Sequence, residues 1–430
     1  MTSTHGDNDW KFLLWSGLAT LRYEGTSATL NCIVYQRSLA KEDLVIEAED
    51  ISGSPRPFFT AGDLQLDIPG FPEPLEVIVV QNSWSSEGHG FLRLRPLRTP
   101  CWFSTSLALH SGRFVVVNFA HYWMGRPQNL DFTLNALGWK AHFIPITGDI
   151  LEISPRFNSD EEFRATHQVE FSREDGSSFT GKQAQVFLEK LSLFLSFCRG
   201  RWVAIALAVG LDGSAEKRLE QWGTGRISSW QEPNGWLDEH HGKCISELYA
   251  EFFSKLNDAA WLDAIRHVVY WFARADTNLV GPDGACILLQ AALERLAWHV
   301  LVRERGAISD KGFRELSAAD QIRLMLNILS IPTEIPVGLV SLQKLGKSKG
   351  LEGPEAFTYI RNRLTHPPKQ GATSALLPLY EAYCLAQWYV ELAILSACGY
   401  NGEYGNRTII RRWVGQVEKV PWASTIRAVG

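Results

Sequence analysis

The sequence predicts an α+β fold in two parts, a β-rich region with a sandwich or barrel-like sheet over residues 1–235 and an all-α helical bundle over residues 236–430. Two observations carry this prediction. The first half alternates short apolar, β-branched runs with Gly, Pro, Asn and Asp. After the turn signal Glu232-Pro233-Asn234-Gly235, apolar residues recur at spacings of three and four. A chain of 430 residues is also too long for one ordinary domain.

The β-rich region should contain eight short strands, and a split near residue 155 would give it two subdomains. Such spacing favours an antiparallel sandwich or barrel. A hairpin centred on Asp175-Gly176, a helix over residues 182–197 and a further strand over residues 202–209 should follow. The eight strands are expected over residues 28–35, 44–48, 64–68, 75–80, 91–96, 113–119, 139–145 and 150–153.

The second half should be built from helices separated by short loops. We expect the breaks at residues 275–283 and 345–353, which are rich in Gly or Lys, to be loops near the functional face. The helices are expected over residues 245–256, 260–275, 284–303, 310–329, 354–365 and 373–397.

Composition indicates a globular cytoplasmic protein that does not enter a membrane. The net charge of -5 argues against a chain coated with nucleic acid. Residues 1–11 are polar, and charged residues interrupt the most apolar segments. The seven cysteines show no C-x-x-C spacing and should be reduced core thiols.

The clearest functional signal is the hexapeptide RNRLTH at residues 361–366, which closes an apolar helical stretch and precedes two prolines. Asn362 and His366 stand four residues apart and would share one face of a helix. Pro367 disfavours the α region for the residue before it, so the helix should end at His366. An imidazole at a helix end is free to meet a substrate.

These residue types suit RNA hydrolysis without a metal ion or another cofactor. The reaction needs a base, an acid and positive charge on the phosphorane. Imidazole exchanges protons near neutral pH, which suits His366 to either role, and Arg361 can clamp a phosphate while Asn362 orients a partner. Arg363 and Thr365 should support the site. Since each chain offers one such histidine, a homodimer would complete the acid and base pair.

Two basic stretches suggest a surface for a polyanion near this motif, although solvated loops can look the same. Residues 344–369 and 407–427 each carry a local charge of +4. The expected RNA-binding residues are Lys344, Lys347, Lys349, Lys369, Arg407, Arg411 and Arg412.

Three other interpretations stay open. The motif can be a solvated helix end whose histidine favours the helix dipole. Glu294, in the middle of an apolar helix, would hold Arg361 in place or be a surface charge. His240, His241 and Cys244 could face one metal ion in a metal-dependent hydrolase, but zinc needs three or four ligands and no further one is recognisably spaced nearby.

The motif resembles the HEPN superfamily, helical domains marked by Arg-polar-x-x-x-His at a helix end. The stretch 359–367, the long helix expected after it, and Gly399-Tyr400-Asn401-Gly402 with Asn406-Arg407 look most like the Apea-like branch. The resemblance covers residues 237–430. It implies a helical bundle that dimerises to form a composite, metal-independent ribonuclease site.

The resemblance also implies a biological setting. Such an enzyme would cleave cellular RNA, for example the anticodon stem of a transfer RNA, leave 2′,3′-cyclic phosphate ends and act in abortive defence against phage. The β-rich region would then be a sensor or brake that responds to a phage-derived trigger. The competing class is a non-catalytic dimeric protein that binds RNA or a nucleotide.

Overall fold

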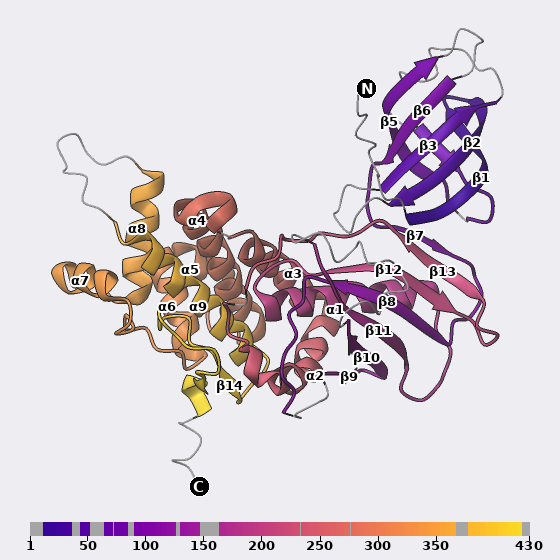
Figure 1. Cartoon of the computed structure of the whole chain (residues 1–430). Helices are drawn as coiled ribbons and strands as arrows, with labels where there is room; N and C mark the ends of the chain where they lie inside the picture. The colour runs from indigo at the N-terminus through magenta and orange to yellow at the C-terminus, as the bar shows by residue number, and fades with distance from the viewer. Residues whose placement is uncertain are drawn as a thin grey trace, which may run out of the picture. The chain divides into compact units, whose positions relative to one another are not determined.

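The computed structural model confirms the predicted fold class, with a β-rich N-terminal region followed by a helical C-terminal region (Figure 1). Its secondary structure begins with a barrel, continues with a second sheet and then consists mainly of helices. The structure describes residues 12–36, 44–51, 64–71, 73–84, 90–125, 130–146, 163–232, 234–275, 277–366 and 377–423.

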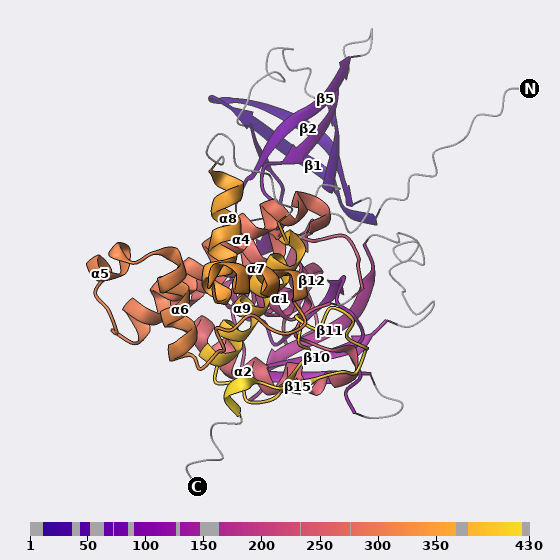
Figure 2. The same cartoon turned by 90° about the vertical axis from the view of Figure 1, so that its left-hand side faces the viewer.

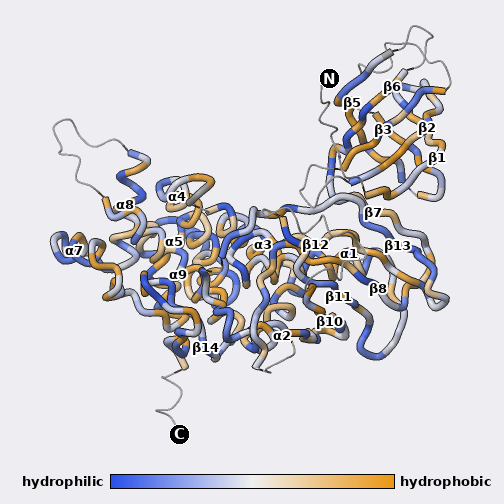
Figure 3. The backbone as a smooth tube through the Cα atoms, viewed as in Figure 1, coloured by the Kyte–Doolittle hydropathy of each residue, from blue (hydrophilic) through white to orange (hydrophobic). Residues whose placement is uncertain are grey.

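Six antiparallel strands close the first sheet into a barrel in the order β1-β2-β3-β6-β5-β4. Alternate residues point inward, as along β2, where Ala28, Leu30, Cys32 and Val34 are buried, and Figure 3 shows the corresponding alternation of hydropathy. Closure leaves no free sheet edge. The strands are β1 (Phe12–Tyr23), β2 (Thr26–Gln36), β3 (Leu44–Asp50), β4 (Leu64–Asp67), β5 (Leu75–Trp84) and β6 (Gly90–Pro96).

The second sheet has seven strands in the order β7-β13-β12-β8-β11-β10-β9. Helix α1 (Gly181–Arg199) covers one face, where Phe187 stacks on Trp139 of β10 with ring centroids 4.5 Å apart. The strands are β7 (Cys101–Ser104), β8 (Ser111–Val117), β9 (Phe132–Ala136), β10 (Trp139–Pro145), β11 (Ala165–Arg173), β12 (Ala204–Leu211) and β13 (Lys217–Trp222).

Several of the helices after residue 238 begin at side-chain caps. Asp258 accepts hydrogen bonds from the backbone N–H groups of Ala260 and Trp261, and Ser317 accepts one from that of Asp320. The helices are η3 (Glu239–His241), α2 (Lys243–Asn257), α3 (Ala259–Arg274), α4 (Thr277–Trp298), η4 (His299–Glu304), α5 (Asp310–Glu315), α6 (Ala318–Ile328), α7 (Val340–Lys349), α8 (Gly353–Thr365) and α9 (Leu379–Ala397).

Helices α4 and α9 form the centre of the helical part. Helix α4 packs against α3, α9, α6 and α8, and Figure 2 shows α6 beside this group. The segment Leu279–Glu304 is long and apolar enough to cross a membrane, and it is the one such segment among the described residues. Since 61% of its most apolar stretch is buried, its composition is that of a core helix and is weak support for a membrane span.

The chain divides into two compact units, which we call the β unit and the helical unit. The helical unit takes two segments from the half predicted to be β-rich. One of them carries Phe194 and Phe197 of α1, whose rings contact Tyr249 and Phe252 of α2. The β unit consists of Met1–Phe119, Gly138–Glu189 and Val203–Gln231, and the helical unit of Ala120–Leu137, Lys190–Trp202 and Glu232–Gly430.

Several local predictions were wrong. The expected loop at 345–353 begins inside α7, whose buried Leu342 and Gly346 lie four residues apart. The expected helix over 310–329 is broken into α5 and α6 where Ser317 caps the second. Strand β11 pairs with β10 and β8 instead of forming a hairpin around residue 175.

Some strands were not predicted, and some predictions fall outside the described residues. Strands β1, β7, β9 and β13 were not predicted, and a two-stranded ladder, β14 (Glu403–Tyr404) with β15 (Glu418–Lys419), follows α9. The strand expected at 150–153 and the division near 155 lie outside the described residues. All seven cysteines are free and buried, as predicted for core thiols.

Candidate functional site

Helix α8 is fixed at its N-terminus by close packing and a capping box. The side chain of Glu352 and that of Glu355 each accept a backbone N–H of the other's residue. Gly353 approaches α9 so closely that a Cβ atom there would lie 2.1 Å from the hydroxyl oxygen of Tyr389. Tyr389 and the Gly353 backbone N–H both donate to the carbonyl of Thr333. The start of the helix therefore cannot shift without a clash.

The other end of α8 stops where the sequence predicted. His366 is the C-cap residue, with φ -119° and ψ 120°, and its backbone N–H donates to the carbonyl of Asn362 over 2.9 Å. This extended conformation is what the following proline imposes. Asn362, Thr365 and His366 are exposed to solvent, and Figure 1 shows this end of α8 standing clear of α7 and α9.

Arg361 is half-buried beside these exposed residues. One terminal nitrogen of its guanidinium group donates to Oδ1 of Asn362 over 3.2 Å. Its Nε is buried and has no hydrogen-bond partner among the described residues. The two terminal nitrogens make no other hydrogen bond within the described residues, so they keep N–H donors for a ligand such as a phosphate. The structure thus brings Arg361 and Asn362 together on the turn that ends at His366.

The supporting residues behave differently from one another. The Thr365 hydroxyl donates to two backbone carbonyls of its own helix. Its oxygen lies 3.3 Å from the carbonyl oxygen of Arg361 and 3.4 Å from that of Asn362. Arg363 is partly buried, and its side chain forms no ion pair within the described part of the chain. Glu294 accepts a hydrogen bond from Gln290 at 2.7 Å. The described contacts contain no ion pair between Glu294 and Arg361, so the expected clamp is absent there.

Three exposed lysines on α7, which we call the α7 lysine patch, adjoin α8. The ammonium group of Lys349 lies 5.0 Å from the ring centre of Tyr359, one turn before Asn362. Lys344 and Lys347 are also exposed. Lys369 lies outside the described residues. The patch and the end of α8 therefore present positive charge from adjacent elements.

Arg323 of α6, which the sequence analysis missed, neutralises the acidic start of α8. Its guanidinium group pairs with Glu355 at 2.8 Å, with Glu352 and with Asp320. Two carboxylates that would repel a polyanion are thus occupied within the protein. The signal available in the sequence was the Glu-x-x-Glu pair at the helix start, which marks a capping box but does not reveal the partner.

Arg407 was wrongly assigned to an RNA-binding surface. Its side chain is 8% exposed and donates to Glu391 of α9 over 2.6 Å and 3.2 Å, while the Glu391 side chain is fully buried. Glu391 also accepts the backbone N–H of Trp236 at 3.2 Å. A carboxylate in the middle of so apolar a helix requires such a partner, because an unpaired buried charge is strongly unfavourable.

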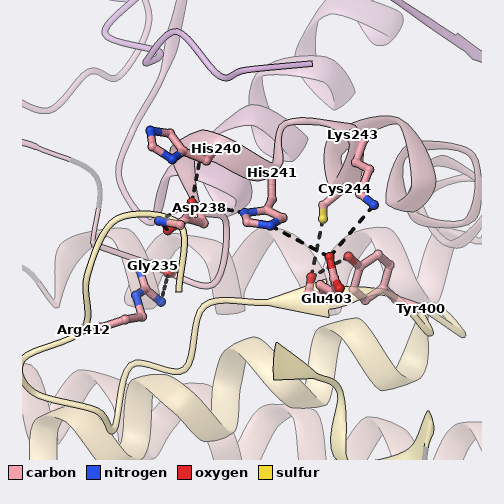
Figure 4. A network of polar contacts seen from close by, with 10 residues as sticks. Gly235, Asp238, His240, His241, Lys243, Cys244, Tyr400, Glu403 and Arg412 are labelled. Carbon is pink, nitrogen blue, oxygen red and sulfur yellow. Dashed lines mark hydrogen bonds and ion pairs between the residues drawn. The ribbon is translucent and has the colours of Figure 1, made fainter. Parts of the chain in front are cut away.

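Of the two neighbouring arginines, Arg411 is exposed and Arg412 is bound within the protein. Arg411 is exposed and remains available to a polyanion. Arg412 is partly buried, and burial lowers the pKa of its guanidinium group. It donates to the carbonyl of Gly235 over 3.1 Å (Figure 4). Gly405 makes room for it, since a Cβ atom there would collide with the Arg412 guanidinium group.

His240, His241 and Cys244, the residues considered for a metal site, belong to a hydrogen-bonded network around Asp238 (Figure 4). Asp238 accepts the backbone N–H groups of His240 and Gly415 and lies 3.3 Å from Nδ1 of His241. Burial opposes ionisation of Asp238, but these hydrogen bonds outweigh it and lower the pKa of the carboxyl group. The network ties the segment before α2 to the segment after α9.

The same network accounts for Cys244. Its thiol donates to the carbonyl of Glu403 over 3.5 Å, and burial raises the pKa of the thiol, which keeps it protonated. No group of three or more His, Cys, Asp or Glu side chains within the described residues is placed to hold a metal ion. The geometry of these residues is that of a structural clamp.

Comparison with known proteins shows similarity to YopA over most of the second sheet and the helices. Residues 128–233 match the family model of the YopA central domain, and residues 258–419, which include the end of α8, match that of the YopA C-terminal domain. No solved structure matches the chain. These matches do not address the HEPN resemblance, which stays a prediction.

One similar relative is the SPbeta prophage-derived uncharacterized protein YopA of Bacillus subtilis (strain 168), with 27% identity over 272 residues. The alignment covers 63% of this chain and 61% of the relative, so the chain matches less than two thirds of the relative's length. In its central and C-terminal parts, the chain is therefore similar to a prophage-derived YopA protein.

Proposed function

We propose that the chain is a metal-independent endoribonuclease of the HEPN type, with its site at the C-terminal end of α8. The observation that carries the proposal is the exposure of His366 at the C-cap, five residues after an Arg361 whose guanidinium group forms no ion pair within the described residues. His366 would exchange a proton with RNA, Arg361 would bind the phosphate and stabilise charge on the phosphorane, and Asn362 would orient the arginine.

The substrate would reach this site along a positively charged surface. The α7 lysine patch lies beside α8, and Arg323 occupies the nearby carboxylates, so a phosphate backbone would meet little repulsion. Arg363 and Arg411 would add further phosphate contacts. Because the motif supplies one imidazole per chain, the proposed enzyme is a cytoplasmic homodimer in which two α8 ends form one composite site.

The proposed setting is defence against phage, with the β unit as the regulatory part. The similarity to a prophage-derived protein supports a place in the conflict between phage and bacterium. The target would be cellular RNA, with transfer RNA as the first candidate. A phage-derived signal acting on the β unit would release the activity.

The test is RNA cleavage by purified wild-type protein and His366→Ala in EDTA. Total bacterial RNA is the substrate, and fragment ends are sequenced and assayed for 2′,3′-cyclic phosphate. His267→Ala is the matched control, because His267 is another exposed histidine, 52% accessible, on helix α3. We expect cleavage by wild type and His267→Ala, and a loss of about 10²-fold or more in His366→Ala.

Two results would contradict the proposal. Equal cleavage by His366→Ala would place the chemistry elsewhere, and activity that disappears in EDTA would indicate a metal-dependent enzyme. RNA that is bound but left intact by wild type, in cells with and without phage infection, would support the non-catalytic RNA-binding alternative.

A further inference from the structure

A cavity of about 700 Å³ lies within the β unit, on strands of the seven-stranded sheet and the start of β1. This volume is within the usual range of small-molecule sites. Its apolar walls include Phe12, Leu14, Val115 and Leu207. Neither the proposed ribonuclease site nor any residue of α8 takes part in it.

The register of the sheet shows which residues share the face that lines the cavity. Val115 of β8 lies opposite Gln168 of β11 and Ala206 of β12, and residues opposite one another point to the same face. The pairing of β12 is interrupted between Ala206 and Val209 by a bulge, in which Leu207 adopts a positive φ of 54°. Such bulges redirect side chains. Here Leu207 lines the cavity.

Gln221 of β13 brings an unsatisfied acceptor to the cavity. Its side-chain nitrogen donates to the carbonyls of Ile205 at 2.9 Å and Gly223 at 3.2 Å, which fixes the amide orientation. Its Oε1 is buried and has no hydrogen-bond partner among the described residues, and Gln221 as a whole is 2% exposed. A buried acceptor of this kind is unfavourable unless a donor reaches it.

Arg113 gives the cavity an unpaired positive charge. Its side chain forms no hydrogen bond or ion pair within the described part of the chain, although Glu170 stands opposite it in the sheet. The other charged residues of the lining, Lys217 and Glu220, pair with each other at 2.9 Å. The cavity therefore combines an apolar wall, a guanidinium group without a partner among the described residues, and a buried acceptor.

We propose that this cavity binds an amphipathic organic anion, a small molecule with an apolar body, one carboxylate or sulfonate group and an N–H or O–H donor. The anionic group would pair with Arg113, the donor would reach Oε1 of Gln221, and the apolar body would lie against Val115 and Leu207. The β unit is then a ligand-binding unit whether or not the helical unit cleaves RNA.

The test uses 8-anilinonaphthalene-1-sulfonate, which carries a sulfonate, an N–H donor and apolar rings. Its fluorescence is titrated against the full chain and then displaced by dodecanoate, dodecanol or dodecyltrimethylammonium, which share one alkyl chain and differ in charge. We expect dodecanoate to displace the probe roughly tenfold more strongly than either of the others, because it alone pairs with a guanidinium group.

Variants locate the effect in the cavity. Arg113→Gln should remove the preference for the anion, with an unchanged unfolding midpoint because Arg113 is exposed and unpaired. Arg98→Gln is the matched control, since this 88% exposed arginine does not line the cavity, and it should keep the preference. Displacement that ignores head-group charge, or a preference that survives Arg113→Gln, would overturn the proposal.

Discussion

Arg361 and Arg407 have similar surroundings in the sequence but different surroundings in the folded helical unit. Each belongs to a stretch with a local charge of +4. Arg361 lies at the exposed end of α8 with a donor left unsatisfied, whereas the Arg407 side chain is buried and paired with Glu391. Local charge therefore does not determine which of the two arginines can bind a ligand. What decides it is whether a carboxylate lies close enough to pair with the arginine.

The difference follows from the helices that the two arginines face. Helix α9 is buried along nearly its whole length, so Glu391 inside it needs a cationic partner. Arg407 meets that need and is removed from the surface. The last turn of α8 ends in solvent, and the carboxylates at the start of the helix, Glu352 and Glu355, are already paired with Arg323. No carboxylate pairs with Arg361 within the described residues, so its guanidinium group is left available.

The largest effect should come from breaking the buried ion pair. Glu391→Leu leaves Arg407 charged, buried and unpaired, and it also removes the acceptor for the Trp236 backbone N–H. We expect the free energy of unfolding to fall by about 3–5 kcal/mol in urea denaturation. Adding Arg407→Met should restore much of the loss, since a buried apolar pair costs less than a lone charge. A single variant as stable as wild type would show that the pair is unimportant.

A second prediction concerns the α7 lysine patch. Replacing Lys344, Lys347 and Lys349 together by Gln should weaken binding of single-stranded RNA and reduce its dependence on salt. Each lost phosphate contact lowers the slope of log K against log salt by about 0.7. The measurement is fluorescence anisotropy across a salt series. A control with Lys140, Lys182 and Lys311 replaced by Gln changes the net charge equally on other exposed positions. Equal slopes in both triple variants would remove the patch from the RNA-binding surface.

The smallest predicted effect concerns a buried histidine that forms no ion pair within the described residues. His299 is 3% exposed against the ring of Trp261, and burial lowers its pKa below the ordinary value of 6.5. The unfolded chain then binds the proton more readily, so the contribution of His299 to stability is present above pH 6.5 and is lost as pH falls toward the folded-state pKa. The sign is therefore a loss of stability on acidification.

The check compares wild type with His299→Phe, which keeps an aromatic ring against Trp261. Between pH 7.5 and about 5.5, urea denaturation should show a steeper loss for wild type than for the variant. Parallel pH profiles would mean that His299 is protonated equally easily in the folded and unfolded chain.

The end of α8 was predictable because its determinants are local. Pro367 fixes the conformation of His366, and the spacing of Asn362 and His366 fixes the shared face. The pairing of Arg407 with Glu391 was not predictable from spacing, since it joins α9 to a later segment through tertiary packing. Glu391 within an apolar helix was the available signal that a cation must be nearby.

In the sheets too, local patterns were predictable from the sequence and contacts between distant segments were not. Alternation along β2 and β6 predicted strands, because each buries one face. Strand β1 was missed, although it pairs with β2 over its length, because Gly17 and a shifted register interrupt its pattern. Arg113 and Gln221 could not be brought together from sequence, since they come from β8 and β13, about a hundred residues apart.

The most direct measurement compares Arg361→Gln with Arg407→Gln for both RNA cleavage and unfolding. We expect Arg361→Gln to lose cleavage by about 10²-fold or more and to change the unfolding free energy by less than about 1 kcal/mol. Arg407→Gln should unfold more easily by several times that amount and cleave normally per folded molecule. Normal cleavage by Arg361→Gln, or equal destabilisation by both substitutions, would contradict the assignment of the site to the end of α8.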